Sequence, residues 1–168
     1  LLLIVSGFRK LLKTITAFTV AHSLTLGLAT LGFVHVPPAP TEAVISLSIL
    51  FLALEIVRMH AGEVTLTQRR PWLVAFAFGL FHGLGFAGAL SQVGVPAHEV
   101  PLALLMFNVG VEAGQVLFLG AVVGVLAALR RVPVSMPQGS WRLMPYTIGG
   151  LATFWTIQRV VSAFTLSS

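Results

Sequence analysis

Charged residues are scarce in this 168-residue sequence: they make up 9% of the chain, against roughly 25% in a typical soluble domain. Hydrophobic residues make up 57%, and the mean hydropathy is +0.96. So few charges cannot cover the surface of a water-soluble globule. The composition therefore excludes that class and predicts a membrane protein.

Cysteine is absent, which excludes disulfide bonds, thiolate metal sites and thiol catalysis. An intramembrane protease is not expected either. The sequence has no Gly-x-Ser-Gly segment, and His98-Glu99 lacks the second histidine of a His-Glu-x-x-His zinc motif. Ligands for a metal must therefore come from nitrogen and oxygen atoms.

The basic residues stand in small clusters between apolar stretches and give a net charge of +5. This spacing is typical of loops at one membrane face and argues against nucleic acid as a partner. The clusters are Arg9, Lys10 and Lys13; Arg58, Arg69 and Arg70; and Arg130, Arg131 and Arg142. Because the connections at 34–40 and 94–100 carry no Lys or Arg, the positive-inside rule predicts cytoplasmic basic loops and a periplasmic C-terminus. Arg159 is the exception, and we expect it to extend to the outer interface beside Trp155.

Five apolar stretches are near the roughly 20 residues that a bilayer-spanning helix needs. They lie at about 14–33, 41–58, 72–93, 101–129 and 145–165, separated by Pro, Gly and Arg clusters. The fold class predicted is an all-α, polytopic transmembrane bundle that forms a single integral membrane domain over residues 1–168. Residues 1–5 resemble the end of a further helix, and the sequence does not begin with Met. We therefore expect an N-terminal truncation with a sixth helix before it.

The fourth stretch is too long for a simple crossing. At about 1.5 Å per residue it would extend roughly 44 Å, against a hydrocarbon core of about 30 Å. It must tilt, protrude or break. Gly110 and Gly114 flank Glu112 there, and they would permit either local unwinding, as in discontinuous transporter helices, or close approach of a neighbouring helix.

Three polar side chains lie on one face of that fourth stretch. Asn108, Glu112 and Gln115 are spaced i, i+4 and i+7 in an otherwise apolar run. A carboxylate at the bilayer centre costs at least roughly 2.5 to 3.5 kcal/mol, and such residues usually face a protein interior on a path for ions or protons. This face is therefore predicted to line the interior of the bundle.

Two histidines are predicted at a similar depth in other spans. His22 shares a helix face with Thr19 and Thr25, and His82 lies among glycines whose Gly79–Gly83 spacing is typical of close helix contacts. Both imidazoles should lie roughly 12 to 15 Å from the cytoplasmic interface. They could therefore converge with the polar face of the fourth span.

Imidazole with carboxylate oxygen suits a divalent first-row metal such as nickel, cobalt, zinc or iron, whereas cuprous copper would favour Cys or Met clusters. An incomplete His/Glu/Asn site would release its ion more readily than a closed structural site, and metal binding should displace protons. A structural alternative is open for each residue, because buried His, Asn and Gln side chains also form interhelical hydrogen bonds. The candidate metal ligands are His22, His82, Glu112, Asn108 and Gln115.

The other ionisable residues are expected to have structural or surface roles. Glu55 should pair with Arg58 or a loop arginine, and Glu42 should be stabilised by the helix dipole in the first turn of its span. Surface positions are expected for three further histidines, His35, His60 and His98.

Three segments resemble the signatures of the HupE/UreJ family of membrane proteins. They are FTVAHSLTL (18–26), FGLFHGLGFA (78–87) and FNVGVEAGQ (107–115), and AVISLS (43–48) with Glu55 is similar to the family's intervening helix. The resemblance implies a bacterial inner-membrane permease that supplies nickel to hydrogenase or urease, with cobalt as a second cargo. The matching polar positions are His22, His82, Asn108, Glu112 and Gln115. The family's metal motif in its first helix, a histidine followed by an Asp-His pair, has no equivalent here.

Two classes of function are therefore carried forward. The first is a non-enzymatic permease in the lipid bilayer, which transports divalent nickel or cobalt and holds no tightly bound cofactor. The second is a non-transporting accessory subunit, in which the polar and glycine-rich faces bind partner subunits of a membrane complex. A b-type haem between His22 and His82 is a third possibility, which a Soret band would reveal.

Overall fold

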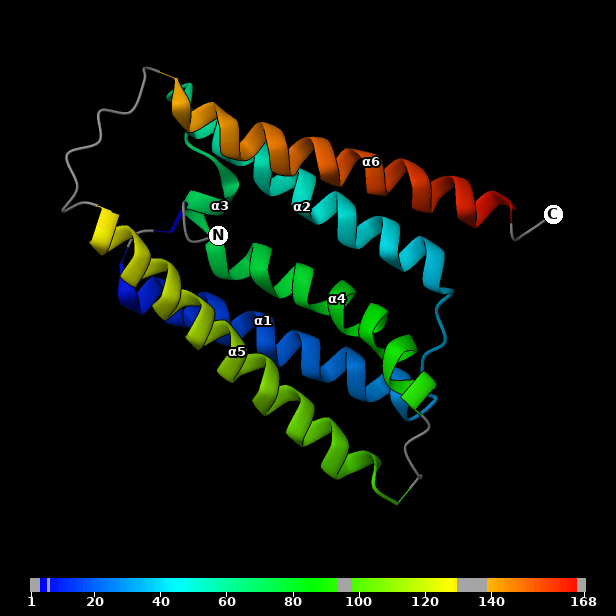
Figure 1. The fold of residues 1–168 in the computed structure, drawn as a ribbon. Coiled ribbons are helices and arrows are strands. Elements are labelled where there is room, and N and C mark those ends of the chain that lie inside the picture. The colour runs from blue at the N-terminus through cyan, green and yellow to red at the C-terminus, as the bar shows by residue number, and fades with distance from the viewer. Residues whose placement is uncertain (1–3, 6, 94–97, 130–138, 166–168) are drawn as a thin grey trace.

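The computed structural model describes residues 4–5, 7–93, 98–129 and 139–165 (Figure 1). Five long helices are α1 (Phe8–Thr30), α2 (Pro38–His60), α4 (Pro71–Val93), α5 (Val100–Leu129) and α6 (Leu143–Thr165). Short α3 (Leu66–Arg69) precedes α4, and the 3-10 turn η1 (Ser140–Arg142) precedes α6. No strand occurs in these described segments, and each predicted span corresponds to one long helix, so the all-α prediction is confirmed. The expected preceding helix falls at residues 1–5, of which 1–3 lie outside the described residues.

The long helices lie side by side in the order α6, α2, α4, α1, α5 (Figure 1). The contact between α1 and α4 is the most extensive, followed by that between α2 and α6. α5 meets the rest of the molecule chiefly along α1. Consequently α4 lies at the centre of the row between α2 and α1, and α5 and α6 are the outermost helices.

Length and composition fit a bilayer. α1, α2 and residues Val100–Val125 of α5 are each long and apolar enough to cross a membrane, and Pro71–Ala87 of α4 is a shorter apolar segment. The sides of the helices expose large apolar side chains, among them Leu117 at 74%, Phe118 at 66% and Phe154 at 63%. Such a surface is unfavourable in water and favourable against lipid.

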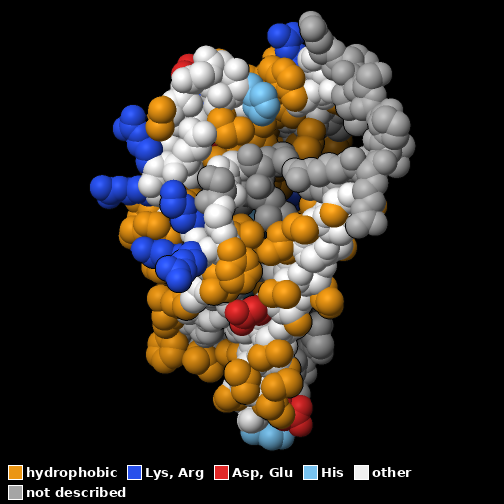
Figure 2. Space-filling model, turned by 90° about the vertical axis from the view of Figure 1, so that its left-hand side faces the viewer, with side chains coloured by type: hydrophobic (Ala, Val, Ile, Leu, Met, Phe, Trp, Pro, Cys, Tyr) orange, Lys and Arg blue, Asp and Glu red, His pale blue; other side chains and the backbone are white. Residues whose placement is uncertain are grey.

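One end of the helix bundle, along the direction of the helix axes, carries most of the positive charge, and we call it the basic end. α1, α4 and α6 begin there and α2 ends there, and Figure 2 shows Lys and Arg side chains gathered on this face. Two of these cations lie over tryptophan rings. Lys13 Nζ is 4.8 Å from the centroid of the Trp72 ring, and the Arg142 guanidinium is 5.6 Å from the centroid of the Trp141 ring. Aromatic rings beside basic groups are typical of a membrane interface.

The boundary of the first span differs from the prediction. α1 begins at Phe8 rather than near residue 14, so Arg9, Lys10 and Lys13 form its first turns instead of a preceding loop. Their aliphatic stems can lie along the helix while the charged groups reach water. The basic cluster therefore stays at the interface although it is helical.

α5 runs as one continuous helix through Gly110 and Gly114. The local unwinding considered for this stretch does not occur. Its thirty residues extend about 45 Å, so the helix must tilt or protrude from the bilayer. No described atom lies within 4 Å of a Cβ built at Gly110 or Gly114, so these glycines are not used for close packing within the described part of the chain.

The closest helix contact is made by the glycines of α4 against α1. A Cβ at Gly79 would lie 2.5 Å from the carbonyl oxygen of Phe18, and one at Gly83 would collide with the carbonyl oxygen of His22. The Thr25 hydroxyl donates a hydrogen bond of 2.8 Å to the carbonyl oxygen of Leu80 across this contact. The predicted small-residue surface at Gly79 and Gly83 is thus confirmed, and it fixes the backbones on both sides of His22.

Two carboxylates have partners other than those expected. Glu55 is buried, and its Oε2 accepts a 2.7 Å hydrogen bond from the backbone N–H of Thr67 in α3 rather than pairing with an arginine. Glu42 Oε2 lies 3.0 Å from Arg159 Nε and ties α2 to α6. Arg159 is the basic residue at the opposite end from the others. It therefore has a carboxylate partner, in addition to the expected position at the outer interface.

His35, His60 and His98 are exposed, as expected. The ring of His60 stacks on Trp141, with centroids 4.0 Å apart, and its Nδ1 lies 2.9 Å from the carbonyl oxygen of Ile56. His98 Nε2 lies 3.6 Å from Glu99 Oε1. These contacts account for two of the three without any role in the interior.

Candidate functional site

His22 is the most buried histidine of the described residues, with 2% of its surface exposed. Neither Nδ1 nor Nε2 has a hydrogen-bond partner, and the neighbouring Thr19 hydroxyl is also buried without one. Leaving a buried polar group unsatisfied costs about 1 to 3 kcal/mol. The ring nitrogens of His22 are therefore candidate ligands for an ion or molecule that binds reversibly.

Phenylalanine rings from three helices surround His22. Phe18 of α1 and Phe107 of α5 stack on it, with centroids 5.8 and 6.2 Å away, and Phe86 of α4 meets it edge-on at 5.6 Å. Phe86 and Phe107 also contact each other, with centroids 5.9 Å apart. The imidazole thus lies in an apolar enclosure that offers it no hydrogen-bond donor or acceptor.

His82 of α4 also contacts Phe18. Its ring is 5.5 Å from that of Phe18, in an edge-on arrangement, so both imidazoles contact the same phenylalanine. His82 Nε2 is 3.1 Å from the Ser48 hydroxyl of α2, which also donates to the carbonyl oxygen of Ile45. The structure therefore brings the two predicted histidines to one level between α1, α2 and α4.

Asn108 connects α5 to this level. Its Oδ1 accepts a 2.7 Å hydrogen bond from the Ser23 hydroxyl, which neighbours His22 in α1, and its Nδ2 donates to the carbonyl oxygen of Leu104. The Asn108 amide therefore joins α5 to α1 beside His22. This contact matches the interhelical role that was one of the two alternatives for Asn108.

Glu112 is not brought to the histidines. It lies one turn beyond Asn108 and is exposed on the side of α5. Among the described residues, no three His, Cys, Asp or Glu side chains stand close enough together to hold a metal ion. Metal binding by the five predicted residues stays a prediction.

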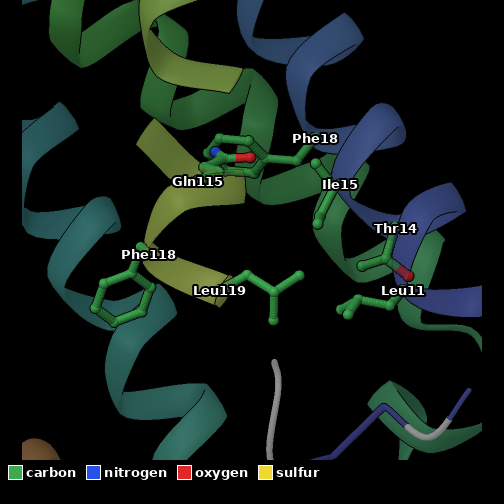
Figure 3. A pocket seen from close by; sticks show the side chains of 7 residues that line it. All are labelled: Leu11, Thr14, Ile15, Phe18, Gln115, Phe118 and Leu119. Carbon is green, nitrogen blue, oxygen red and sulfur yellow. The ribbon is translucent and has the colours of Figure 1, made fainter. Parts of the chain in front are cut away.

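Gln115 lines a cavity of about 210 Å³ between α1 and α5 (Figure 3). Apart from Gln115 and Thr14 the lining is apolar, and its residues are Leu11, Thr14, Ile15, Phe18, Gln115, Phe118 and Leu119. Phe18 belongs both to this cavity and to the contacts of the two histidines. Phe18 therefore connects the histidine pair to this cavity.

Several of these contacts were not predicted as part of the site. Ser48 appeared only as the last residue of the AVISLS segment, and the three phenylalanines belong to the same motif segments as the polar residues. Their sequence positions were a usable signal, because each lies within four residues of His22, His82 or Asn108. Which ring meets which imidazole depends on how the helices pack.

Comparison with known families decides the classification. A family model described as HupE / UreJ protein matches residues 1–159. The chain belongs to the HupE/UreJ family. No curated protein and no solved structure matches it.

HupE/UreJ membership agrees with the apolar helices and makes this a membrane protein of a family associated with nickel and cobalt transport and with accessory roles, not with catalysis. The three motifs that contain His22, His82 and Glu112 all lie inside the matched range. The acidic residues of the sequence are five glutamates, with no aspartate. The Asp-His pair of the family's first-helix motif is accordingly not found in this HupE/UreJ chain.

Proposed function

We propose that this HupE/UreJ protein is an inner-membrane permease for a divalent transition metal, nickel in the first place and cobalt as the second cargo. Its basic end would face the cytoplasm, as the positive-inside rule predicts, and the C-terminus the periplasm. The metal ion is the cargo and not a resident cofactor.

The observation that carries the proposal is the pair of unpaired ring nitrogens of His22. Neutral imidazole nitrogen is a ligand for nickel and cobalt, and an enclosed imidazole with no competing hydrogen bond is available to a passing ion. His82, which contacts the same Phe18 ring, would be a second nitrogen ligand. Two nitrogens are too few for a closed, permanent site, which suits a cargo that must leave.

Glu112 would supply the missing negative charge. In an α-helix, position i+4 lies about 40° further round the axis than position i. Asn108 already contacts α1, so a modest rotation of α5 would carry Glu112 toward α1. The limited contact between α5 and its neighbours makes α5 the element best placed for this movement.

Each residue then has a defined part. His22 and His82 bind the ion, Glu112 offsets its charge and exchanges a proton, and Asn108 and Gln115 orient the ligands. Phe18 would have to change rotamer for an ion to pass between the histidines and the cavity beside Gln115. Metal binding would displace protons from these groups, so transport should be coupled to proton movement.

Uptake of radioactive nickel in cells that lack other nickel importers tests this proposal. The natural protein should raise uptake, and His82→Ala and Glu112→Gln should each abolish the increase at equal membrane expression. His35→Ala is the matched control, because it removes an exposed histidine outside the interior. Competing cobalt should lower the signal, and zinc should lower it less.

The second candidate, a non-transporting accessory subunit, is favoured by one feature of α5. Its glycines at 110, 114, 120 and 124 have no described atom within 4 Å of a Cβ position, and glycine-rich faces allow close helix association in membranes. Copurification of a stable complex with the chain, together with the absence of uptake of any metal, would favour this alternative. The same result would contradict the proposed permease function.

A further inference from the structure

A groove at the basic end combines two cations with an apolar trough. It lies along α1 beside α4 and has a volume of about 510 Å³. Arg9 and Lys13 stand at one end of it, and the rest of its lining is Leu12, Thr16, Ala17, Val20 and Phe76. None of these residues belongs to the site described above.

Among the described residues, neither cation of this groove has a carboxylate partner. In the described part of the chain, ion pairs join His98 to Glu99 and Arg159 to Glu42, and no carboxylate lies within ion-pair distance of Arg9 or Lys13. Lys13 Nζ instead lies over the Trp72 ring, 4.8 Å from its centroid. Two cations beside an interfacial tryptophan attract an anion at the depth of lipid headgroups.

The length of the groove matches one lipid leaflet. From Arg9 to Val20 the helix rises about 16 Å, and half of a typical hydrocarbon core is about 15 Å. Leu12 and Val20 are 52% and 56% exposed, so the trough is open to the side where lipid lies. An acyl chain that follows the trough would end near the midplane while its headgroup stays between Arg9 and Lys13.

We propose that this groove binds an anionic phospholipid of the leaflet at the basic end. The phosphate is held by Arg9 and Lys13, Trp72 covers the glycerol region, and one acyl chain lies against Ala17, Val20 and Phe76. Basic pockets between membrane helices are recognised sites for such headgroups. The proposal does not depend on the transported cargo, because the groove is separate from His22 and His82.

Native mass spectrometry of the purified chain tests it, with phosphatidylglycerol and phosphatidylcholine of identical acyl chains as probes. The natural protein should retain phosphatidylglycerol preferentially. Arg9→Gln combined with Lys13→Gln should weaken that binding about tenfold to thirtyfold, given the contribution of each basic residue near an anionic surface. Arg58→Gln combined with Arg142→Gln removes the same charge from the same end outside the groove, and should leave the preference unchanged.

The apolar half is tested separately by Val20→Trp, which fills the trough and keeps both charges. It should lower retention of phosphatidylglycerol, and inorganic phosphate should not compete. Helical circular dichroism and a monodisperse elution profile show that each variant is folded. Equal retention of the two lipids by the natural protein, or equal loss in the groove and control pairs, would overturn the proposal.

Discussion

His22 places a polar ring where the fold gives it nothing to bind. The surrounding rings of Phe18, Phe86 and Phe107 could pack equally well against an apolar side chain. A purely structural histidine would be expected to find at least one partner, as His82 does with Ser48. The difference between the two histidines can be measured as stability.

We predict opposite effects for one substitution at these two positions. His22→Leu should raise the free energy of unfolding by about 1 kcal/mol, because it removes an unsatisfied buried group. His82→Leu should lower it by about 1 kcal/mol, because it breaks the bond to Ser48. Unfolding in mixed micelles with a rising fraction of denaturing detergent measures both changes in the free energy of unfolding. A loss at His22 as large as that at His82 would mean that His22 has a structural role.

At this scale the sequence indicated which residues matter but not all of their partners. The i, i+4, i+7 spacing placed Asn108 and Gln115 on one inward face, and in the structure both lie against α1. It could not fix how far α5 is rotated, and Glu112 lies just outside the contact. The bonds of Glu55 to Thr67 and of Glu42 to Arg159 join segments far apart in the sequence, so no local pattern indicated them.

Among the elements, α1 and α4 form the fixed pair and α5 the loosely attached one. Gly79 and Gly83 let the backbone of α4 touch that of α1 on both sides of His22. The glycines of α5 have open space instead. The same residue type therefore has different consequences in the two helices.

Two alanine substitutions should reveal this contrast. Gly83→Ala should lower the free energy of unfolding by about 1 to 3 kcal/mol, because the added methyl group collides with the α1 backbone. Gly110→Ala should raise it by about 0.5 to 1 kcal/mol, because alanine favours a helix interior and meets no neighbour. Detergent unfolding of both variants provides the comparison. Destabilisation by Gly110→Ala would show instead that α5 packs closely against something.

The order of the helices could be predicted only in part. The glycine spacing in 79–83 indicated a close contact for α4, and the structure confirms it with α1 as the partner. Hydropathy could not indicate the partner helix, because a membrane helix is apolar both on the side that faces lipid and on the side that faces other helices. It also placed the start of α1 six residues late, because Arg9, Lys10 and Lys13 lower the local hydropathy while remaining helical.

The whole molecule has one basic end, which predicts its orientation. Because the chain has no cysteine, each introduced cysteine can be labelled uniquely. With the basic end in the cytoplasm, His35→Cys should react with a membrane-impermeant maleimide in intact cells. Glu63→Cys, exposed at the basic end, should react only after the membrane is permeabilised. The reverse pattern would show that the protein is inserted the other way.

Transport by the purified chain alone is the most direct test of the central claim. Sealed proteoliposomes that contain a nickel-sensitive dye should show metal entry with the natural protein and a loss of at least about tenfold with His22→Leu. His60→Leu, at the surface beside Trp141, should transport normally. Entry at the natural rate in the folded His22→Leu variant, or no entry with the natural protein, would contradict a permease that passes its ion across the buried histidine.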